Sequence, residues 1–110
     1  MSEIQELEAQ KEDLKAQVEL RDQILKLSAN HEFRKVIHEE FFQKEAGRRV
    51  RIGGEPARDK HQRQDAIDMA LATGHLQGFL SANVQMGNRA EQTIFEIDAA
   101  LEELRAEGAE

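Results

Sequence analysis

Six basic side chains gathered in one short segment are the strongest candidates for ligand binding in this sequence. They are Arg48, Arg49, Arg51, Arg58, Lys60 and Arg63, and only two acidic side chains lie among them. Cationic groups at this density could neutralise the phosphates of a nucleic acid. The segment has no aromatic side chain on which a base could stack, and the remainder of the chain carries nine basic against twenty acidic side chains. We therefore expect the six residues to contact protein, with nucleic acid the disfavoured alternative.

Two glycines and the only proline of the chain interrupt this segment, in the sequence IGGEP. A phosphate-binding Walker loop requires Gly-Lys-Ser/Thr after four intervening residues, which is absent here. A dinucleotide-binding loop requires a surrounding βαβ unit, and the sequence predicts none. Glycine and proline together are typical of a corner between helices, so we expect a loop over residues 51–56.

Histidine, a frequent metal ligand, occurs four times, and cysteine does not occur. His31 and His38 are seven residues apart, and His61 is four residues from Asp65. A metal site needs three or four converging ligands, and isolated pairs of this kind arise often in a charged helical chain. The absence of cysteine excludes disulfides, thiolate zinc sites and thiol nucleophiles. We expect no metal, no cofactor and no catalytic residue, and hence a protein that is not an enzyme.

The N-terminal residues predict a charged coiled-coil helix over 1–28. Ser2 and Gln5 have the spacing of a capping box, which satisfies two backbone N–H groups at the start of a helix. The apolar positions are Ile4, Leu7, Leu14, Val18 and Leu25. Lys11 and Arg21 occupy seam positions at which a heptad repeat would have leucine. Their long stems can cover apolar surface while their charges reach water.

Two further helices are expected. Asn30 is a good N-cap for a shorter, phenylalanine-rich middle helix over 30–50. Its predicted apolar face is Phe33, Val36, Ile37 and Phe41, with Phe42 beside it. A long C-terminal helix follows over 57–107, with a bend expected near Gly74.

The long helix carries the most regular apolar pattern in the chain. Steps of four and three residues join Leu76, Leu80, Asn83, Gly87, Ala90, Ile94, Ile97 and Leu101, and continue to Leu104. Such alternation is typical of a coiled-coil seam. Phe79 and Met86 form a second stripe, so the helix should have two neighbours: the first helix and another subunit. The sequence thus predicts a single all-α domain of three helices, a long antiparallel helical hairpin with the shorter middle helix.

Two stretches of the chain resemble small helical coiled-coil proteins of tailed bacteriophages. The first is LSANHEFRKVIHEEFFQKEAGRRV. It resembles a motif of the type F-K-x-V-I-x-x-x-F-F-x-x-E-A, with matches at Phe33, Val36, Ile37, Phe41, Phe42, Glu45 and Ala46. The second, LQGFLSANVQMGNRAEQTIFEIDAALEEL, contains Q-M-G-x-x-A-E at Gln85, Met86, Gly87, Ala90 and Glu91. The resemblance implies a phage origin and brings no established activity with it.

These patterns predict a non-catalytic bacteriophage structural or assembly protein that self-associates through its helices. The alternative is a small phage protein that binds and inhibits a host factor, such as a nuclease, polymerase or defence enzyme. The expected partners are other copies of the chain and other phage or host proteins. No apolar run has the roughly 18 residues of a membrane span, and the charged N-terminus is unlike a signal peptide, so we expect the host cytoplasm or the virion.

Overall fold

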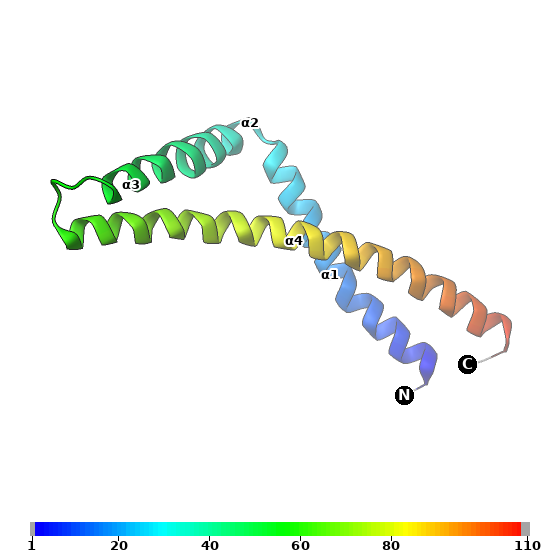
Figure 1. Ribbon diagram of the computed structural model, residues 1–110. Helices are drawn as coiled ribbons and strands as arrows, with labels where there is room; N and C mark the ends of the chain where they lie inside the picture. The colour runs from blue at the N-terminus through cyan, green and yellow to red at the C-terminus, as the bar shows by residue number, and fades with distance from the viewer. Residues whose placement is uncertain (1, 109–110) are drawn as a thin grey trace. The chain divides into compact units, whose positions relative to one another are not determined.

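The computed structural model describes residues 2–108, and these residues form helices and connecting turns without a strand. The elements are α1 (Glu3–Ala29), α2 (His31–Phe33), η1 (Arg34–Glu45), α3 (Ala46–Gly53) and α4 (Lys60–Ala106), shown in Figure 1. The segments α2, η1 and α3 follow one another without a break and make up the shorter middle helix. The predicted all-α fold of three helices is therefore confirmed.

The chain divides into two compact units. One unit, here called the terminal unit, is built from the residues up to Leu25 and from Ala82 onward. The other, the central unit, is Lys26–Ser81. Each unit has buried residues of its own, and each is described separately below.

Both predicted helix starts in the first part of the chain are confirmed. The backbone N–H of Gln5 donates to Ser2 Oγ and that of Ser2 donates to Gln5 Oε1, each over 3.1 Å, which is the reciprocal pattern of a capping box. The backbone N–H of Phe33 donates to Asn30 Oδ1 over 2.9 Å, so Asn30 caps the middle helix.

The long helix begins at Lys60, three residues later than predicted. Asp59 Oδ1 accepts the backbone N–H of Gln62 over 2.8 Å and so acts as the N-cap. Pro56, which suited the first turn of a helix, lies instead in the turn that leads to Asp59. Beyond this start, α4 continues through Gly74 without interruption.

The middle helix has π-helical geometry over its central twelve residues, a correction to the α-helix that the sequence predicted. In a π-helix each N–H bonds the carbonyl five residues earlier, as Ala46 does with Phe41. Side chains five residues apart therefore become neighbours. The rings of Phe33 and His38 lie 5.5 Å apart, and Lys35 Nζ lies 3.0 Å from Glu40 Oε1.

This change of period also alters the predicted apolar face of the middle helix. His38 packs edge-on against Phe33 and also against Phe42, whose ring centroid is 5.3 Å away. Phe42 is buried, whereas Val36, predicted to lie on the apolar face, is 57% exposed. Spacing by five and four residues thus sets this face, in place of the three-and-four spacing of an α-helix.

The terminal unit is an antiparallel hairpin of α1 and the second half of α4, as predicted. Ile4, Ile97 and Leu101 form its buried apolar cluster, and Leu7, Leu14 and Leu104 pack around this cluster. Ion pairs show the direction of the helices, because Glu8 pairs with Arg105, Lys11 with Asp98 and Arg21 with Glu91. As the residue number rises along α1, the residue number of its partner on α4 falls, so the two helices run antiparallel.

In the central unit, the end of α3 lies against the start of α4. A Cβ atom added at Gly53 would lie 2.7 Å from Ile67 Cγ1, so the glycine permits this close approach. Arg63 Nε donates to the carbonyl oxygen of Gly53 over 3.0 Å and holds the same junction. Ala66 and Thr73, seven residues apart on α4, are the most deeply buried side chains of the unit.

Candidate functional site

The six basic residues of the predicted partner-binding segment lie on two helices and on the loop between them. Arg48, Arg49 and Arg51 lie on α3, Arg58 lies in the loop, and Lys60 and Arg63 lie in the first turn of α4. Arg48 and Arg51 line one surface hollow, whereas Lys60 and Arg63 line another with Gly53 and Ile67. Four of the six cations therefore line two separate hollows.

Three of these six cations already have partners close by in sequence. Glu45 accepts hydrogen bonds from both Arg48 and Arg49, and Arg58 donates to Glu55 over 2.6 Å. The hydrogen bond from Arg48, followed by that from Arg49, lowers the pKa of Glu45 below its usual value. Arg51 and Lys60 form no ion pair within residues 2–108. These two residues are the most available for an external acidic partner.

The histidines lie apart from one another except in one place. His31 and His38 line the same surface hollow on the middle helix, together with Arg34 and Glu39. The ring of His38 also packs between two phenylalanines, as described above. Within residues 2–108, no three His, Cys, Asp or Glu side chains lie close enough together to hold a metal ion.

The most deeply buried charge described in the structure is Arg21, at the centre of the α1–α4 seam. It is 8% exposed. Its Nη2 donates to Glu91 Oε1 over 2.9 Å and its Nη1 donates to Asn88 Oδ1 over 3.0 Å. Nε and Nη2 both donate to Asp22. The hydrogen bond to Glu91, followed by that to Asp22, raises the pKa of the guanidinium. One cation thus joins α1 to α4 through a bond between two residues that are 70 positions apart in the sequence.

Gly87 makes room for the stem of this arginine. A Cβ atom at position 87 would lie 2.9 Å from Arg21 Cγ and closer still to Cβ, so no larger residue fits without a shift of the helices. The absence of a side chain at Gly87 therefore lets α1 approach α4 closely at Arg21.

This arrangement explains part of the Q-M-G-x-x-A-E motif physically. Gly87 accommodates the arginine, Ala90 is 2% exposed within the seam, and Glu91 accepts the arginine's hydrogen bond. Asn88 was missed as an Arg21 partner. The sequence did contain a signal for this contact. Asn88 and Glu91 are three residues apart on α4, and Arg21 occupies a seam position of the opposite helix.

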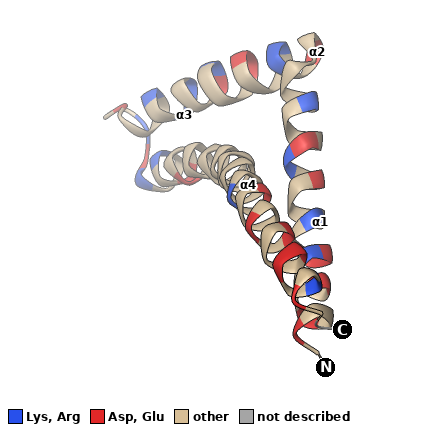
Figure 2. Ribbon diagram, turned by 90° about the vertical axis from the view of Figure 1, so that its right-hand side faces the viewer, with Lys and Arg blue, Asp and Glu red and all other residues tan. Residues whose placement is uncertain are grey.

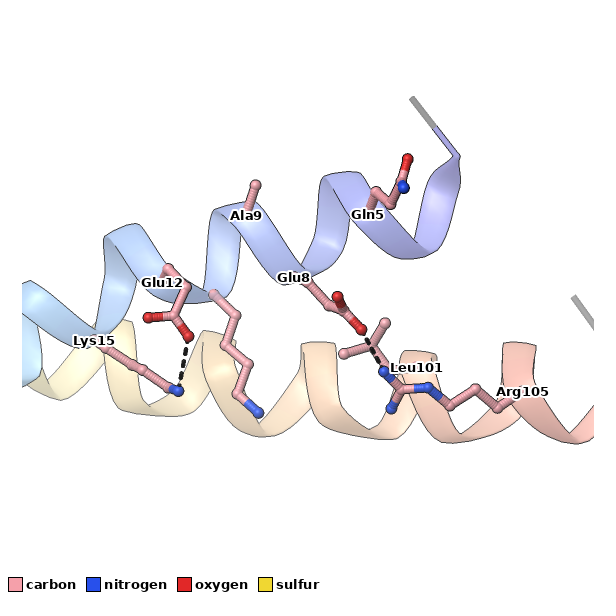
Figure 3. Close-up of a pocket in the computed structure, with 8 residues that line it drawn as sticks. Gln5, Glu8, Ala9, Glu12, Lys15, Leu101 and Arg105 are labelled. Atoms are coloured by element: carbon pink, nitrogen blue, oxygen red, sulfur yellow. Dashed lines mark hydrogen bonds and ion pairs between the residues drawn. The ribbon is translucent and has the colours of Figure 1, made fainter. Parts of the chain in front are cut away.

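Ion pairs also flank the apolar cluster of the terminal unit. Lys11 Nζ lies 2.5 Å from Asp98 Oδ1, and Glu8 pairs with Arg105. Figure 3 shows Glu8 pointing toward Arg105 beside Leu101, whereas Gln5 and Ala9 point away from α4. The hollow in this view is lined by residues of both helices, and within it Lys15 pairs with Glu12 as Arg105 does with Glu8.

The predicted seam on α4 is largely buried within the chain. Gly87, Ile97 and Leu101 contact side chains of α1. Asn83, Leu80 and Ile94 are half-buried, and Leu76 is 39% exposed. From Gly87 onward, the seam is therefore occupied by α1.

The second predicted stripe on α4 is accessible. Phe79 is 54% exposed and Met86 is 42% exposed. The stripe thus differs from the seam, which α1 covers.

Comparison with known proteins gave no match: no protein family, no curated protein and no solved structure is similar to this chain. No helix among residues 2–108 has the length and apolar character needed to cross a membrane.

Proposed function

We propose that this chain is a non-catalytic protein that acts through helix-mediated self-association and contacts with other proteins. Its role would be that of a bacteriophage structural or assembly component. The phage setting rests on the resemblance of the middle helix and of the Gln85–Glu91 region to coiled-coil proteins of tailed phages. The association rests on how the chain distributes its apolar side chains.

Within residues 2–108, more large apolar side chains are exposed than buried. The exposed ones are Leu20, Leu25, Leu27, Val36, Val50, Met69, Leu71, Leu76, Phe79, Met86 and Phe95. The buried apolar residues number seven, and two of these are alanines. Burial of apolar area is the dominant favourable term in protein association. Apolar residues that recur along one helix are typical of protein interfaces.

Absolute mass in solution, measured by light scattering at low and high salt, tests this proposal. We expect a discrete oligomer whose mass falls as salt rises, because the terminal unit carries fourteen acidic against five basic side chains and the central unit eight against ten. Figure 2 shows acidic residues along α1 and in the C-terminal part of α4. A monomer at all concentrations and salt levels would contradict self-association.

Abundance in purified virions separates the structural role from inhibition of a host factor. A structural component should be present at many copies in each particle, and an assembly factor should be abundant in immature particles. A chain that is nearly absent from both kinds of particle, but is recovered bound to one host enzyme, would support the inhibitor instead.

A further inference from the structure

Phe95, on the part of α4 that belongs to the terminal unit, projects an aromatic ring into solvent. It is 72% exposed, more than any other large apolar side chain that the structure describes. It follows the buried Ala90 by five residues and precedes the buried Leu101 by six, so it lies about 120–140° around α4 from the side that contacts α1. The α1–α4 hairpin therefore leaves this ring uncovered.

Carboxylates surround Phe95 on the same side of α4. Glu91 lies four residues before it, Asp98 three residues after it and Glu102 seven residues after it. Glu91 and Asp98 already bind cations of α1. Glu102 is exposed, and its side chain forms no ion pair within residues 2–108. One aromatic ring and one unpaired carboxylate thus stand side by side, and we call Phe95 and Glu102 the α4 knob.

A surface hollow of opposite charge lies on the middle helix in the central unit. It is lined by Glu40, Gln43, Lys44, Glu45, Arg48 and Arg51. Lys44 pairs with Glu40 over 3.0 Å, and Arg48 pairs with Glu45 over 2.7 Å. Arg51 forms no ion pair within residues 2–108, so the hollow has one positive charge in excess. We call it the α3 hollow.

The guanidinium of Arg51 lies against the surface of α3. A Cβ atom added at Gly47, one turn earlier, would lie 3.5 Å from Arg51 Nη1. A guanidinium packs favourably on an aromatic face and also pairs with carboxylates. The methylene stems of Lys44 and Arg48 add apolar surface to the same hollow. The α3 hollow therefore suits an aromatic ring that has a carboxylate beside it.

We propose that the α4 knob of one copy inserts into the α3 hollow of a second copy. This inference rests on the self-association proposed above and specifies its two surfaces. Phe95 fills the hollow and packs against the guanidinium of Arg51, and Glu102 forms an ion pair with the same guanidinium. The knob lies within the terminal unit and the hollow within the central unit.

Charge favours this pairing over the pairing of two identical surfaces. The terminal unit has fourteen acidic against five basic side chains, and the central unit has eight against ten. Two knobs placed face to face would bring carboxylates together, and two hollows would bring together two unpaired arginines. Knob and hollow are opposite in charge, and complementary charges select one partner surface over another.

A contact between two different surfaces is heterologous. Each copy has one knob and one hollow and can therefore bind two neighbours. Such contacts close into a ring when the rotation between neighbours permits it, and otherwise they extend into an open filament. The discrete oligomer expected above is then a ring.

Two variants that each lose one surface test the contact. Phe95→Ala with Glu102→Lys removes the knob, and Arg51→Glu reverses the unpaired charge of the hollow. Each variant alone should be monomeric by light scattering at concentrations at which the native chain is oligomeric. An equal mixture retains one intact knob on one chain and one intact hollow on the other. The mixture should therefore form a complex of two chains and nothing larger.

Matched control variants change the same kinds of residue elsewhere in the two units. Met86→Ala with Glu103→Lys is the control for the knob, because Met86 is exposed and lies nine residues before Phe95, on the opposite side of α4. Lys60→Glu is the control for Arg51→Glu, because Lys60 has no ion pair either and lines a different hollow. Both controls should keep the native mass. Equal loss of association in the controls would show that net charge drives association, and would overturn the proposal.

The remaining outcomes separate this proposal from the self-association on which it rests. Native-sized oligomers of the two test variants would place the interface elsewhere and leave self-association intact. Two monomeric variants that form no complex when mixed, with helicity unchanged by circular dichroism, would overturn the pairing of knob with hollow. A native chain that is monomeric at every concentration and salt level would remove both proposals.

Exchange of the two charges within one chain provides a second readout. Glu102→Arg alone and Arg51→Glu alone should each raise the dissociation constant at least tenfold at low salt, because each brings like charges together. The double variant places the guanidinium on the knob and the carboxylate in the hollow, so it should restore the native constant to within a few-fold. Failure to restore association, with helicity unchanged, would overturn the predicted ion pair.

Discussion

Arginine side chains lie in different surroundings in the two compact units. In the terminal unit, Arg21 is buried and its guanidinium bonds residues 67 and 70 positions away in the sequence. In the central unit, Arg48, Arg49 and Arg58 are 30–49% exposed in their side chains and pair with carboxylates three or four residues away. The first kind of contact fixes two helices against each other. The second kind supports a single helix or turn and leaves its surface open to solvent.

This difference shows which charges hold the fold. Exposed pairs three or four residues apart on a helix contribute a few tenths of a kcal/mol each. A buried cation with its acceptors arranged around it defines the register of the helices, and removal of a partner leaves a costly unpaired charge. We therefore expect substitutions around Arg21 to affect stability more than substitutions in the basic segment.

The largest effect is expected from Gly87→Ala. The new methyl group would collide with Cβ and Cγ of Arg21, which are fixed to the α1 backbone and cannot swing aside as the tip of a side chain could. Overpacking of this kind costs about 1–3 kcal/mol, against a gain of at most about 1 kcal/mol in helix propensity. Thermal or urea unfolding of the full chain measures the net loss.

A second substitution shows whether the collision itself is responsible. Arg21→Ala in the Gly87→Ala background removes the obstructing stem, so the two changes should be less harmful together than their separate effects predict. Additive effects would show that Gly87 is required for a reason other than the arginine.

Next in size is the loss of a partner across the hairpin. Glu91→Gln removes the carboxylate that bonds Arg21 from α4, whereas Asp22→Asn removes one that adjoins Arg21 in sequence. Glu91→Gln should lower the melting temperature more, because Glu91 lies on α4 and its bond to Arg21 joins the two helices, whereas Asp22 lies on α1 beside Arg21. Equal losses for the two variants, measured side by side by circular dichroism, would contradict the register role of Arg21.

The comparison also explains which features the sequence could predict. The capping residues Ser2 and Asn30 act through local backbone groups, and the hairpin follows from regular apolar steps, so both were predictable. The position of the Arg21 side chain in the hairpin was only partly predictable. Its stem was expected to cover apolar surface, but the position of Gly87 opposite it depends on the register of two distant segments.

The π-helix is the clearest feature that sequence pattern did not reveal. The apolar residues of the middle helix fit α-helical spacing, and nothing in them selects bonding to the fifth residue. Contacts such as Phe33–His38 and Lys35–Glu40 accompany that geometry, and they become visible only once it is known. The late start of α4 has a similar cause, since both Pro56 and Asp59 are good starting signals and only one of them is used.

An effect of opposite sign is expected at an open glycine. Gly78 lies within α4, and a Cβ atom added there would have no other atom within 4 Å. Gly78→Ala should therefore stabilise the chain by up to about 1 kcal/mol, the ordinary difference in helix propensity. Its melting temperature, compared with that of Gly87→Ala, isolates steric collision from propensity. Destabilisation by Gly78→Ala would show that this surface is covered in the folded protein.

The smallest effect concerns acid sensitivity in the central unit. The pKa of Glu45 is lowered by its hydrogen bonds from Arg48 and Arg49, so this carboxylate contributes stability above the ordinary glutamate value of about 4.3 and loses that contribution as the pH falls through its lowered pKa. Glu45→Gln should therefore be less stable than the native chain at pH 7 and nearly equal to it at pH 3. Melting curves at the two pH values measure the difference, with Glu39→Gln as control because Glu39 accepts no hydrogen bond within residues 2–108. Since Glu45 and both arginines are partly exposed, salt should reduce this difference in stability further. The buried contacts of Arg21 should respond to salt much less.

The acid response could instead be the same in the native chain and in Glu45→Gln. That outcome would place the acid sensitivity in other carboxylates. Glu40 is the first to examine, because hydrogen bonds from Lys44 and Lys35 lower its pKa.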